Sequence, residues 1–257
     1  MIGIAIVGGA GRMGRVMTEG LGSLAEFDVV ALIDRAPGPT DGEARWFTSL
    51  DELDASSVDA VVDFSTPDGV VASATWCAKH SVALVVGATG LSESDRTVLA
   101  TMAERTAIVV ASNFSIGAVL AERFAAAAAP YFDRVEIIEL HHDAKVDAPS
   151  GTSIATARAI ARARAVADRT TAADPTVRQT VPGSRGATVD GVPVHAVRLP
   201  GLVAHQEVLF GAPGEGLTIR HDSFDRLSFV AGVATVLRQL PTVPGLFEGL
   251  DRFLDVP

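Results

Sequence analysis

The first residues of this chain decide its fold: they read Ile2-Gly3-Ile4-Ala5-Ile6-Val7-Gly8-Gly9-Ala10-Gly11-Arg12-Met13-Gly14. The apolar, β-branched run predicts a buried strand over residues 2–7. Gly8, Gly11 and Gly14 follow at the spacing G-x-x-G-x-x-G, where a helix is expected to begin. Glycines here allow a tight turn, a close backbone approach to an anion and close packing of helix on strand. The stretch therefore predicts a β-α-β unit.

Strand and helix patterns continue to alternate through the first 115 or so residues. The expected strands cover residues 2–7, 29–34, 59–64, 83–86 and 108–111, and helices open at Pro67 and Ser92. This alternation is typical of a parallel sheet with helices on both faces. We therefore expect a doubly wound α/β fold of the Rossmann type.

The second half of the chain has a different pattern. A helix over residues 116–129, a strand over 135–140 and a helix from Thr152 precede a Pro/Gly-rich segment at 181–191. The runs that follow, 194–198, 206–210 and 217–221, are expected strands with no helix between them. They predict an open, mixed and largely antiparallel α+β sheet. A last helix, roughly 224–239, is expected to pack on the first domain.

These patterns predict two domains. Residues 1–115 and 225–257 are expected to form a dinucleotide-binding domain, and residues 116–224 a substrate domain inserted into it. The net charge of −10 argues against nucleic-acid and anionic-membrane surfaces as partners. The single cysteine, Cys77, excludes an intrachain disulfide and reads as a core thiol. The first residues resemble neither a signal peptide nor a membrane span, so we expect a cytoplasmic location.

The glycine-rich turn is a candidate cofactor site. Asp34 ends the expected second strand 20 residues after Gly14, where a carboxylate accepts hydrogen bonds from the ribose of a bound nicotinamide dinucleotide. The carboxylate favours NADH, whereas Arg12, Arg15 and Arg35 could pair with the 2′-phosphate of NADPH or remain solvated surface charges. We expect both cofactors to be used. The turn residues expected to bind the cofactor are Gly8, Gly9, Ala10, Gly11, Arg12 and Met13, with Asp34 and Arg35.

Two further loops end strands of the expected sheet, where ligands of open α/β sheets bind. Their small residues leave room for a nicotinamide ring and its ribose, although each loop alone also fits ordinary turn chemistry. The candidate residues are Gly87, Ala88, Thr89, Ala111, Ser112, Asn113 and Phe114.

The most chemically informative stretch runs from residue 139 to residue 152 and reads Glu-Leu-His-His-Asp-Ala-Lys-Val-Asp-Ala-Pro-Ser-Gly-Thr. Ser150, Gly151 and Thr152 present N–H groups and hydroxyls at a helix start, which suits a carboxylate. Lys145 adds a positive charge, and a histidine such as His141 can deliver a proton. Alternatively, the His-His pair ligates a metal or Pro-Ser-Gly-Thr only caps a helix, but no third ligand stands at a familiar spacing. We expect no metal.

These motifs together resemble the 4-hydroxy-tetrahydrodipicolinate reductase family, the nicotinamide-dependent step of the diaminopimelate route to lysine. The resemblance covers residues 8–15, 61–67, 87–90, 113–118, 139–152 and 183–221, and residues 194–198 and 203–208 are similar to the actinobacterial branch. It implies hydride transfer to a cyclic imine dicarboxylate formed by loss of water. His141 would be the proton donor and Lys145 its substrate-binding partner. His142, Gly151 and Thr152 would hold the carboxylates, Thr89 would close the site, and the substrate-domain sheets would build a homotetramer.

The chain departs from the family's pattern at two places. Asp143 and Ala144 stand where many relatives carry another basic residue, and Ala88 replaces the first threonine of a Gly-Thr-Thr-Gly loop. Both changes leave open a related reductase or dehydrogenase acting on another small imine or amino acid. A regulator that binds the cofactor without turnover is the alternative from another class.

Overall fold

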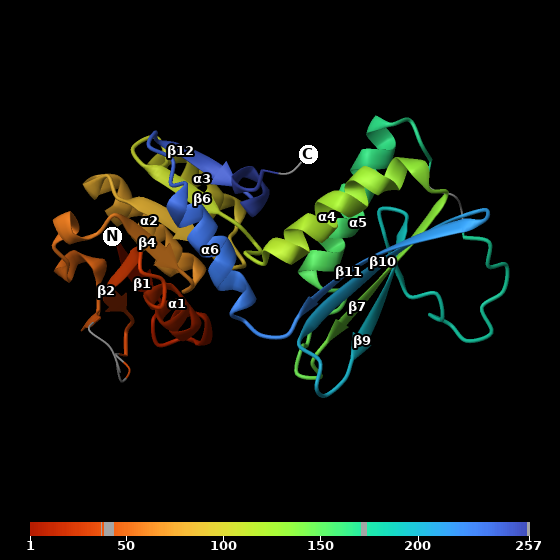
Figure 1. The fold of residues 1–257 in the computed structure, drawn as a ribbon, viewed down its shortest axis with the longest axis horizontal. Helices are drawn as coiled ribbons and strands as arrows, with labels where there is room; N and C mark the ends of the chain where they lie inside the picture. The colour runs from red at the N-terminus through yellow and green to blue at the C-terminus, as the bar shows by residue number, and fades with distance from the viewer. Residues whose placement is uncertain (37, 39–43, 171–173, 256–257) are drawn as a thin grey trace. The chain divides into compact units, whose positions relative to one another are not determined.

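A computed structural model describes residues 1–36, 38, 44–170 and 174–255 of the chain. The chain divides into two compact units (Figure 1). Unit 1 comprises Met1–Ile116 and Arg226–Pro257, and unit 2 comprises Gly117–Asp225. None of the described helices is both long and apolar enough to cross a membrane. The ligands that were assigned to each domain from sequence stay a prediction.

Unit 1 contains a parallel seven-stranded sheet in the order β3-β2-β1-β4-β5-β6-β12. The first six of these strands follow the order of a Rossmann fold, which confirms the expected α/β class. The strands are β1 (Ile2–Val7), β2 (Phe27–Ile33), β3 (Arg45–Phe47), β4 (Ala60–Asp63), β5 (Ala83–Val86), β6 (Ala107–Val110) and β12 (Gly245–Glu248). Strands β3 and β12, at the two edges, were not expected from the sequence.

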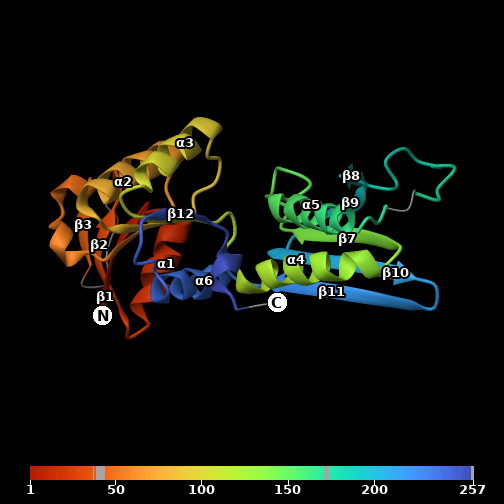
Figure 2. The ribbon, with the colours of Figure 1, turned by 90° about the horizontal axis from the view of Figure 1, so that it is seen from above.

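Helices cover both faces of this sheet (Figure 2). Helices α2 (Pro67–His80) and α3 (Glu93–Met102) lie on one face, and α1 (Arg12–Gly22) and α6 (Ser228–Arg238) on the other. Short 3-10 turns, Leu50–Glu52, Ala55–Ser57 and Leu250–Phe253, complete the unit. Strands β4 and β6 are buried along their whole length, because a sheet covered on both sides has no solvent face.

The expected packing of the last helix on the first domain is confirmed. A Cβ at Gly20 of α1 would stand 2.4 Å from a methyl carbon of Val230 in α6, so the missing side chain is what lets the two helices approach. Helix α6 begins at Ser228, four residues after the expected start.

Unit 2 is built on a five-stranded sheet in the order β11-β10-β7-β9-β8. Strands β7 and β9 pair in parallel and the other neighbours are antiparallel, so the sheet is mixed, as expected. The strands are β7 (Arg134–His141), β8 (Ala187–Val189), β9 (Val192–Arg198), β10 (Ala204–Ala212) and β11 (Glu215–Ser223).

Helices α4 (Ile116–Ala128) and α5 (Gly151–Val166) lie along one face of this sheet, with a 3-10 turn at Ala129–Tyr131 (Figure 1). Alternate strand residues such as Ile137 and Val208 point to this face, where they pack against Ala125 and Ile160 of the helices. The alternation has a consequence for the site: Glu139 and His141, two and four residues after Ile137, lie on the helix-covered face at the end of β7.

Candidate active site

The glycine-rich turn after β1 has the geometry of an anion site. Gly8 has a φ of +81°, and the N–H groups of Gly8 and Gly9 donate to the carbonyl of Ile33 at 2.9 and 3.2 Å. A Cβ at Gly14 would stand 2.2 Å from the carbonyl oxygen of Gly8, so only glycine allows α1 to pack this closely on the turn. Helix α1 begins after Gly11 and has no acidic residue in its first turn. Its positive end is therefore available to an anion.

Asp34 is tied to the same turn. Its Oδ2 accepts a hydrogen bond from the Ala10 N–H at 3.1 Å, which fixes the carboxylate beside the glycines. The Arg15 guanidinium donates to the Ala10 carbonyl from Nε and Nη2, at 3.0 and 2.8 Å. Arg15 thus stabilises the turn by hydrogen bonds. Arg12 and Arg35, like Arg15, are exposed.

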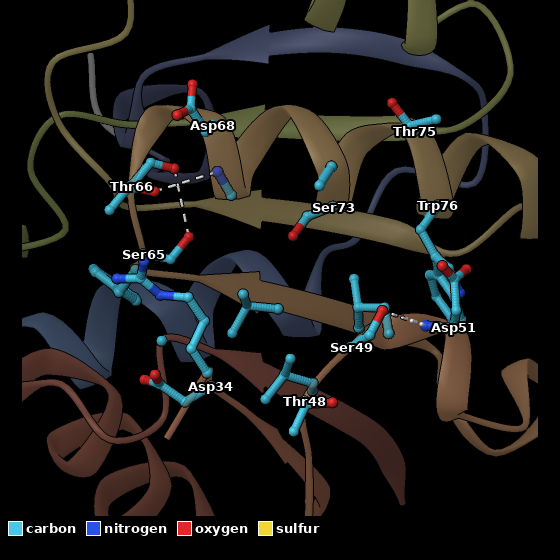
Figure 3. A pocket seen from close by; sticks show the side chains of 18 of the residues that line it. Asp34, Thr48, Ser49, Asp51, Ser65, Thr66, Asp68, Ser73, Thr75 and Trp76 are labelled. Atoms are coloured by element: carbon cyan, nitrogen blue, oxygen red, sulfur yellow. Dashed lines mark hydrogen bonds between the residues drawn. The ribbon is translucent and has the colours of Figure 1, made fainter. Parts of the chain in front are cut away.

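A cavity of about 870 Å³ lies beside this turn (Figure 3). Among the predicted cofactor residues, Gly8, Gly11, Asp34 and Arg35 line it. Thr66 and Asp68 at the start of α2 form one wall, and Asp34, Thr48 and Ser49 lie on the other (Figure 3). Sequence reasoning missed the lining residues that follow β3 and β4: Thr48, Ser49, Leu50, Asp51, Phe64, Ser65, Thr66, Asp68, Gly69, Ala72, Ser73, Thr75, Trp76 and Lys79.

A buried carboxylate lies behind this cavity. Asp63, at the end of β4, is fully buried and accepts hydrogen bonds from the Ser65 N–H at 2.8 Å and the Ser65 Oγ at 2.6 Å. Ser73 Oγ of α2 donates to its other oxygen at 2.6 Å. Burial raises the pKa of Asp63, against the opposing effect of these hydrogen bonds. Asp63 thus orients two serines that line the cavity.

The other two loops predicted to bind cofactor follow β5 and β6, at the carboxyl edge of the parallel sheet. A Cβ at Gly87 would stand 2.1 Å from the ring of Phe64, which itself packs edge-on against Phe114 with centroids 6.1 Å apart. None of these loop residues lines the cavity. Binding of the nicotinamide by Gly87, Ala88, Thr89, Ala111, Ser112, Asn113 and Phe114 therefore stays a prediction, as it does for the turn residues Gly9, Ala10, Arg12 and Met13.

In unit 2, the predicted catalytic histidine lies next to a carboxylate. His141 Nδ1 is 2.5 Å from Oε2 of Glu139, whose side chain is 0% exposed. Arg198, at the end of β9, donates to both oxygens of the same carboxylate at 2.8 and 2.9 Å. Burial opposes ionisation of Glu139, but the hydrogen bonds from His141 and Arg198 outweigh it and hold its pKa below the ordinary value.

The start of α5 adjoins this group. The Ser150 N–H donates to Oε1 of Glu139 at 3.2 Å, and the Ser150 side chain caps the helix by accepting from the Ser153 N–H at 3.1 Å. Gly151 is exposed, and a Cβ added there would meet no atom within 4 Å. The helix start is therefore open to a ligand, and it is hydrogen-bonded to the Glu139 carboxylate that contacts His141.

Lys145 lies in the loop between β7 and α5. Its backbone N–H donates to the His142 carbonyl at 3.2 Å, and its side-chain Nζ is 2.8 Å from both carboxylate oxygens of Asp147. Arg198 Nη2 donates to the Asp147 carbonyl at 2.7 Å. The described residues contain no group of three or more His, Cys, Asp and Glu side chains placed to hold a metal ion.

Sequence reasoning missed Glu139, Asp147 and Arg198 as site residues. For Glu139 a signal was present, since side chains two positions apart on a strand share a face. Arg198 is 59 residues away in sequence and joins the site because β7 and β9 pair in parallel with His141 opposite Arg198.

Comparison with known proteins identifies the family of this site. Family models described as "Dihydrodipicolinate reductase, N-terminus" and "Dihydrodipicolinate reductase, C-terminus" match residues 2–114 and 117–254. The chain belongs to the dihydrodipicolinate reductase family. It is therefore a pyridine-nucleotide-dependent oxidoreductase, and the resemblance noted from its motifs is confirmed.

Individual relatives span the whole chain. A 4-hydroxy-tetrahydrodipicolinate reductase of Cutibacterium acnes is 46% identical and one of Corynebacterium diphtheriae is 43% identical, each with 99% of both chains covered. A solved structure described as a dipicolinate-bound dihydrodipicolinate reductase from Paenisporosarcina is 38% identical, with a TM-score of 0.89 over 99% of this chain and 100% of that one. Both units are thus matched in sequence and in fold.

Proposed function

We propose that this enzyme reduces 4-hydroxy-tetrahydrodipicolinate, by way of dihydrodipicolinate, to tetrahydrodipicolinate in the diaminopimelate route to lysine. The observation that carries the proposal is the group of His141, Glu139 and the α5 start in a chain whose other unit has a dinucleotide turn. NADPH, NADH or both would be the reductant, and the cytoplasm the place of action.

The residues of unit 1 fit a dinucleotide. Glycine stands at the positions of the turn after β1 where a Cβ atom would come too close to backbone atoms. The first turn of α1 has no acidic side chain that would repel a pyrophosphate. Asp34 lines the cavity with its carboxylate fixed at the turn, in place to accept hydrogen bonds from ribose hydroxyls. A bound reduced nicotinamide supplies the hydride.

Unit 2 would bind the dicarboxylate substrate. The N–H groups of Gly151 and Thr152 and the Thr152 hydroxyl at the α5 start, with the helix dipole behind them, suit one carboxylate. Ser150, whose N–H and hydroxyl are engaged by Glu139 and Ser153, would hold this helix start in place. Lys145 and His142 would hold the substrate from the loop before α5. A cyclic imine with two carboxylates uses all of these groups, whereas a monoanionic substrate would leave some unpaired.

His141 would deliver the proton. Its Nδ1 is engaged by Glu139, so Nε2 is the nitrogen available for exchange with a ligand. His141→Gln should lower turnover roughly a hundredfold or more while dinucleotide affinity holds, since general acid catalysis contributes about that much. Lys145→Ala should lower both turnover and substrate affinity. Unchanged turnover in His141→Gln would remove the histidine from this role.

The deciding assay follows oxidation of NADPH and NADH by absorbance, with substrate generated in situ from pyruvate and aspartate semialdehyde by the preceding synthase. Oxidation that depends on both precursors supports the reductase. Binding of both dinucleotides without oxidation would instead favour the cofactor-sensing alternative.

The same assay tests the cofactor hypothesis. Asp34 disfavours a 2′-phosphate, whereas exposed Arg35 at the cavity can pair with one, so we propose that both dinucleotides are used. A preference above roughly a hundredfold for either cofactor would contradict dual use. That ratio corresponds to about 2.7 kcal/mol of discrimination between NADH and NADPH.

We further propose a homotetramer built through the sheet of unit 2. Helices α4 and α5 cover one face of that sheet, and the other face presents half-buried apolar residues such as Ile138, Leu140 and Leu209. Light scattering on purified protein should give four times the chain mass. A monomer at micromolar concentration would contradict this assembly.

A further inference from the structure

A buried carboxylate is shared between a histidine and an arginine at the end of β7. Glu139 is 0% exposed and accepts from His141 Nδ1, from Arg198 Nη1 and Nη2, and from the Ser150 N–H. A carboxylate without such partners would be costly to bury. Because the set of donors is complete, Glu139 stays ionised, with its pKa below the ordinary value.

An ionised Glu139 determines the tautomer of His141. A carboxylate accepts hydrogen bonds and cannot donate them, so Nδ1 of His141 must carry a hydrogen. In the neutral ring Nε2 is then the unprotonated nitrogen, and in the imidazolium it is the one that can release a proton to a ligand.

Arg198 holds the same carboxylate from the other side. Its guanidinium donates to both oxygens of Glu139, so the negative charge that faces His141 is shared with a permanent cation. Arg198 also donates to the Asp147 carbonyl at 2.7 Å and to the Val197 carbonyl at 2.7 Å, which fixes it between β9 and the loop before α5.

We propose that Glu139 and Arg198 are positioning residues for proton delivery by His141. Glu139 directs the transferable proton to Nε2, and Arg198 holds the carboxylate in the position from which it does so. In the transfer the Nε2–H bond of the imidazolium breaks, and the proton joins the substrate atom that becomes negative when hydride is added. The neutral ring keeps its Nδ1–H and regains a proton from solvent. The catalytic part of this inference rests on the proposed function.

Two substitutions test the positioning role through turnover. Glu139→Gln keeps the shape of the side chain but removes its charge, so Nδ1 of His141 no longer has to carry the hydrogen. Turnover should fall roughly 10- to 100-fold, by analogy with the partners that orient metal-bound histidines. Arg198→Gln leaves the carboxylate without its two guanidinium hydrogen bonds and should also lower turnover, and Arg198→Lys, which keeps the positive charge, should recover part of the loss.

The chain contains a matched control on the same strand. Glu136 also contacts a histidine, His195 Nε2 at 2.7 Å, and an arginine, Arg185, but it alternates with the residues that face α5. Glu136→Gln should leave turnover close to the wild-type value. An equal loss of turnover in this variant, or wild-type turnover in Glu139→Gln, would overturn the proposal.

A second measurement does not depend on turnover. Nitrogen-15 NMR of the histidine rings should show neutral His141 protonated at Nδ1 in the wild type, and Glu139→Gln should lose this preference. Circular dichroism with thermal unfolding reports whether the whole chain of each variant, unit 2 included, is folded, and dinucleotide binding, followed by fluorescence, reports on unit 1. If the protein binds dinucleotide but reduces no substrate, the proposed function fails while the tautomer still tests the pair. An Nε2-protonated neutral ring in the wild type would overturn the inference by itself.

Discussion

If Lys145 binds a substrate carboxylate as proposed, Asp147 competes for it, and Asp147→Asn should tighten substrate binding. Lys145 Nζ is 2.8 Å from both oxygens of Asp147, with side-chain exposures of 20% and 59%. A substrate carboxylate that binds Lys145 must displace this partner. Ion pairs of such exposure contribute about 0.2–1 kcal/mol, so their removal should lower KM by about 1.4- to 5-fold.

The pair persists through the neutral range. The hydrogen bond from Lys145 holds the pKa of Asp147 below its ordinary value. The stability that this pair contributes is therefore fully present above the unfolded-state pKa, about 3.9, and is lost as pH falls through the lower folded-state value. Competition for Lys145 should accordingly be undiminished at the neutral pH of the assay.

Initial rates against substrate concentration would measure the effect. Asp143→Asn is the control, because Asp143 is an exposed acid of the same loop with no ion pair among the described residues. It should leave KM close to the wild-type value, and high salt should shrink the advantage of Asp147→Asn. An unchanged or raised KM in Asp147→Asn, or an equal fall in the control, would refute the competition.

Three further predictions concern unit 1. Gly14→Ala should lower dinucleotide affinity at least roughly tenfold in a fluorescence titration, because its Cβ would stand 2.2 Å from the Gly8 carbonyl oxygen and the turn must move; unchanged affinity would contradict this geometry. Burial raises the pKa of the Cys77 thiol, so a thiol reagent should label it only after denaturant is added. Burial also raises the pKa of Asp63, so ionisation of Asp63 destabilises the fold as pH rises. The Tm of Asp63→Asn, relative to that of the wild type, should therefore increase from acidic to neutral pH. The opposite trend would refute the direction of this pKa shift.

The sequence predicted those parts of the fold that depend on local patterns. Strands buried on both faces appear as uninterrupted apolar runs, and glycines mark the turn after β1, where Cβ atoms would clash with the backbone. The unexpected strands β3, β8 and β12 have three or four residues each and lie at sheet edges. Segments this short contain too little alternation to be recognised, and they become strands only because a neighbouring strand pairs with them.

The candidate site, like the fold, was predictable from sequence where it depends on neighbouring residues in the chain. The turn and the residues around the α5 start lie in continuous stretches, so their spacing alone indicated an anion site and a proton donor. The cavity walls after β3 and β4 and the contact of Arg198 with Glu139 depend on strand pairing, which the sequence does not state.

Strand β7 shows what side-chain types alone leave undecided about the surroundings of the proposed proton donor. It carries two Glu-His-Arg clusters of the same composition, one at Glu136 and one at Glu139. The Glu136 side chain is 35% exposed, so water screens its charge. The Glu139 side chain is 0% exposed and is also bonded to the start of α5, so the same three groups act there in a low dielectric beside an anion site. Burial and the neighbouring helix start, rather than composition, therefore distinguish the cluster that we propose for proton delivery.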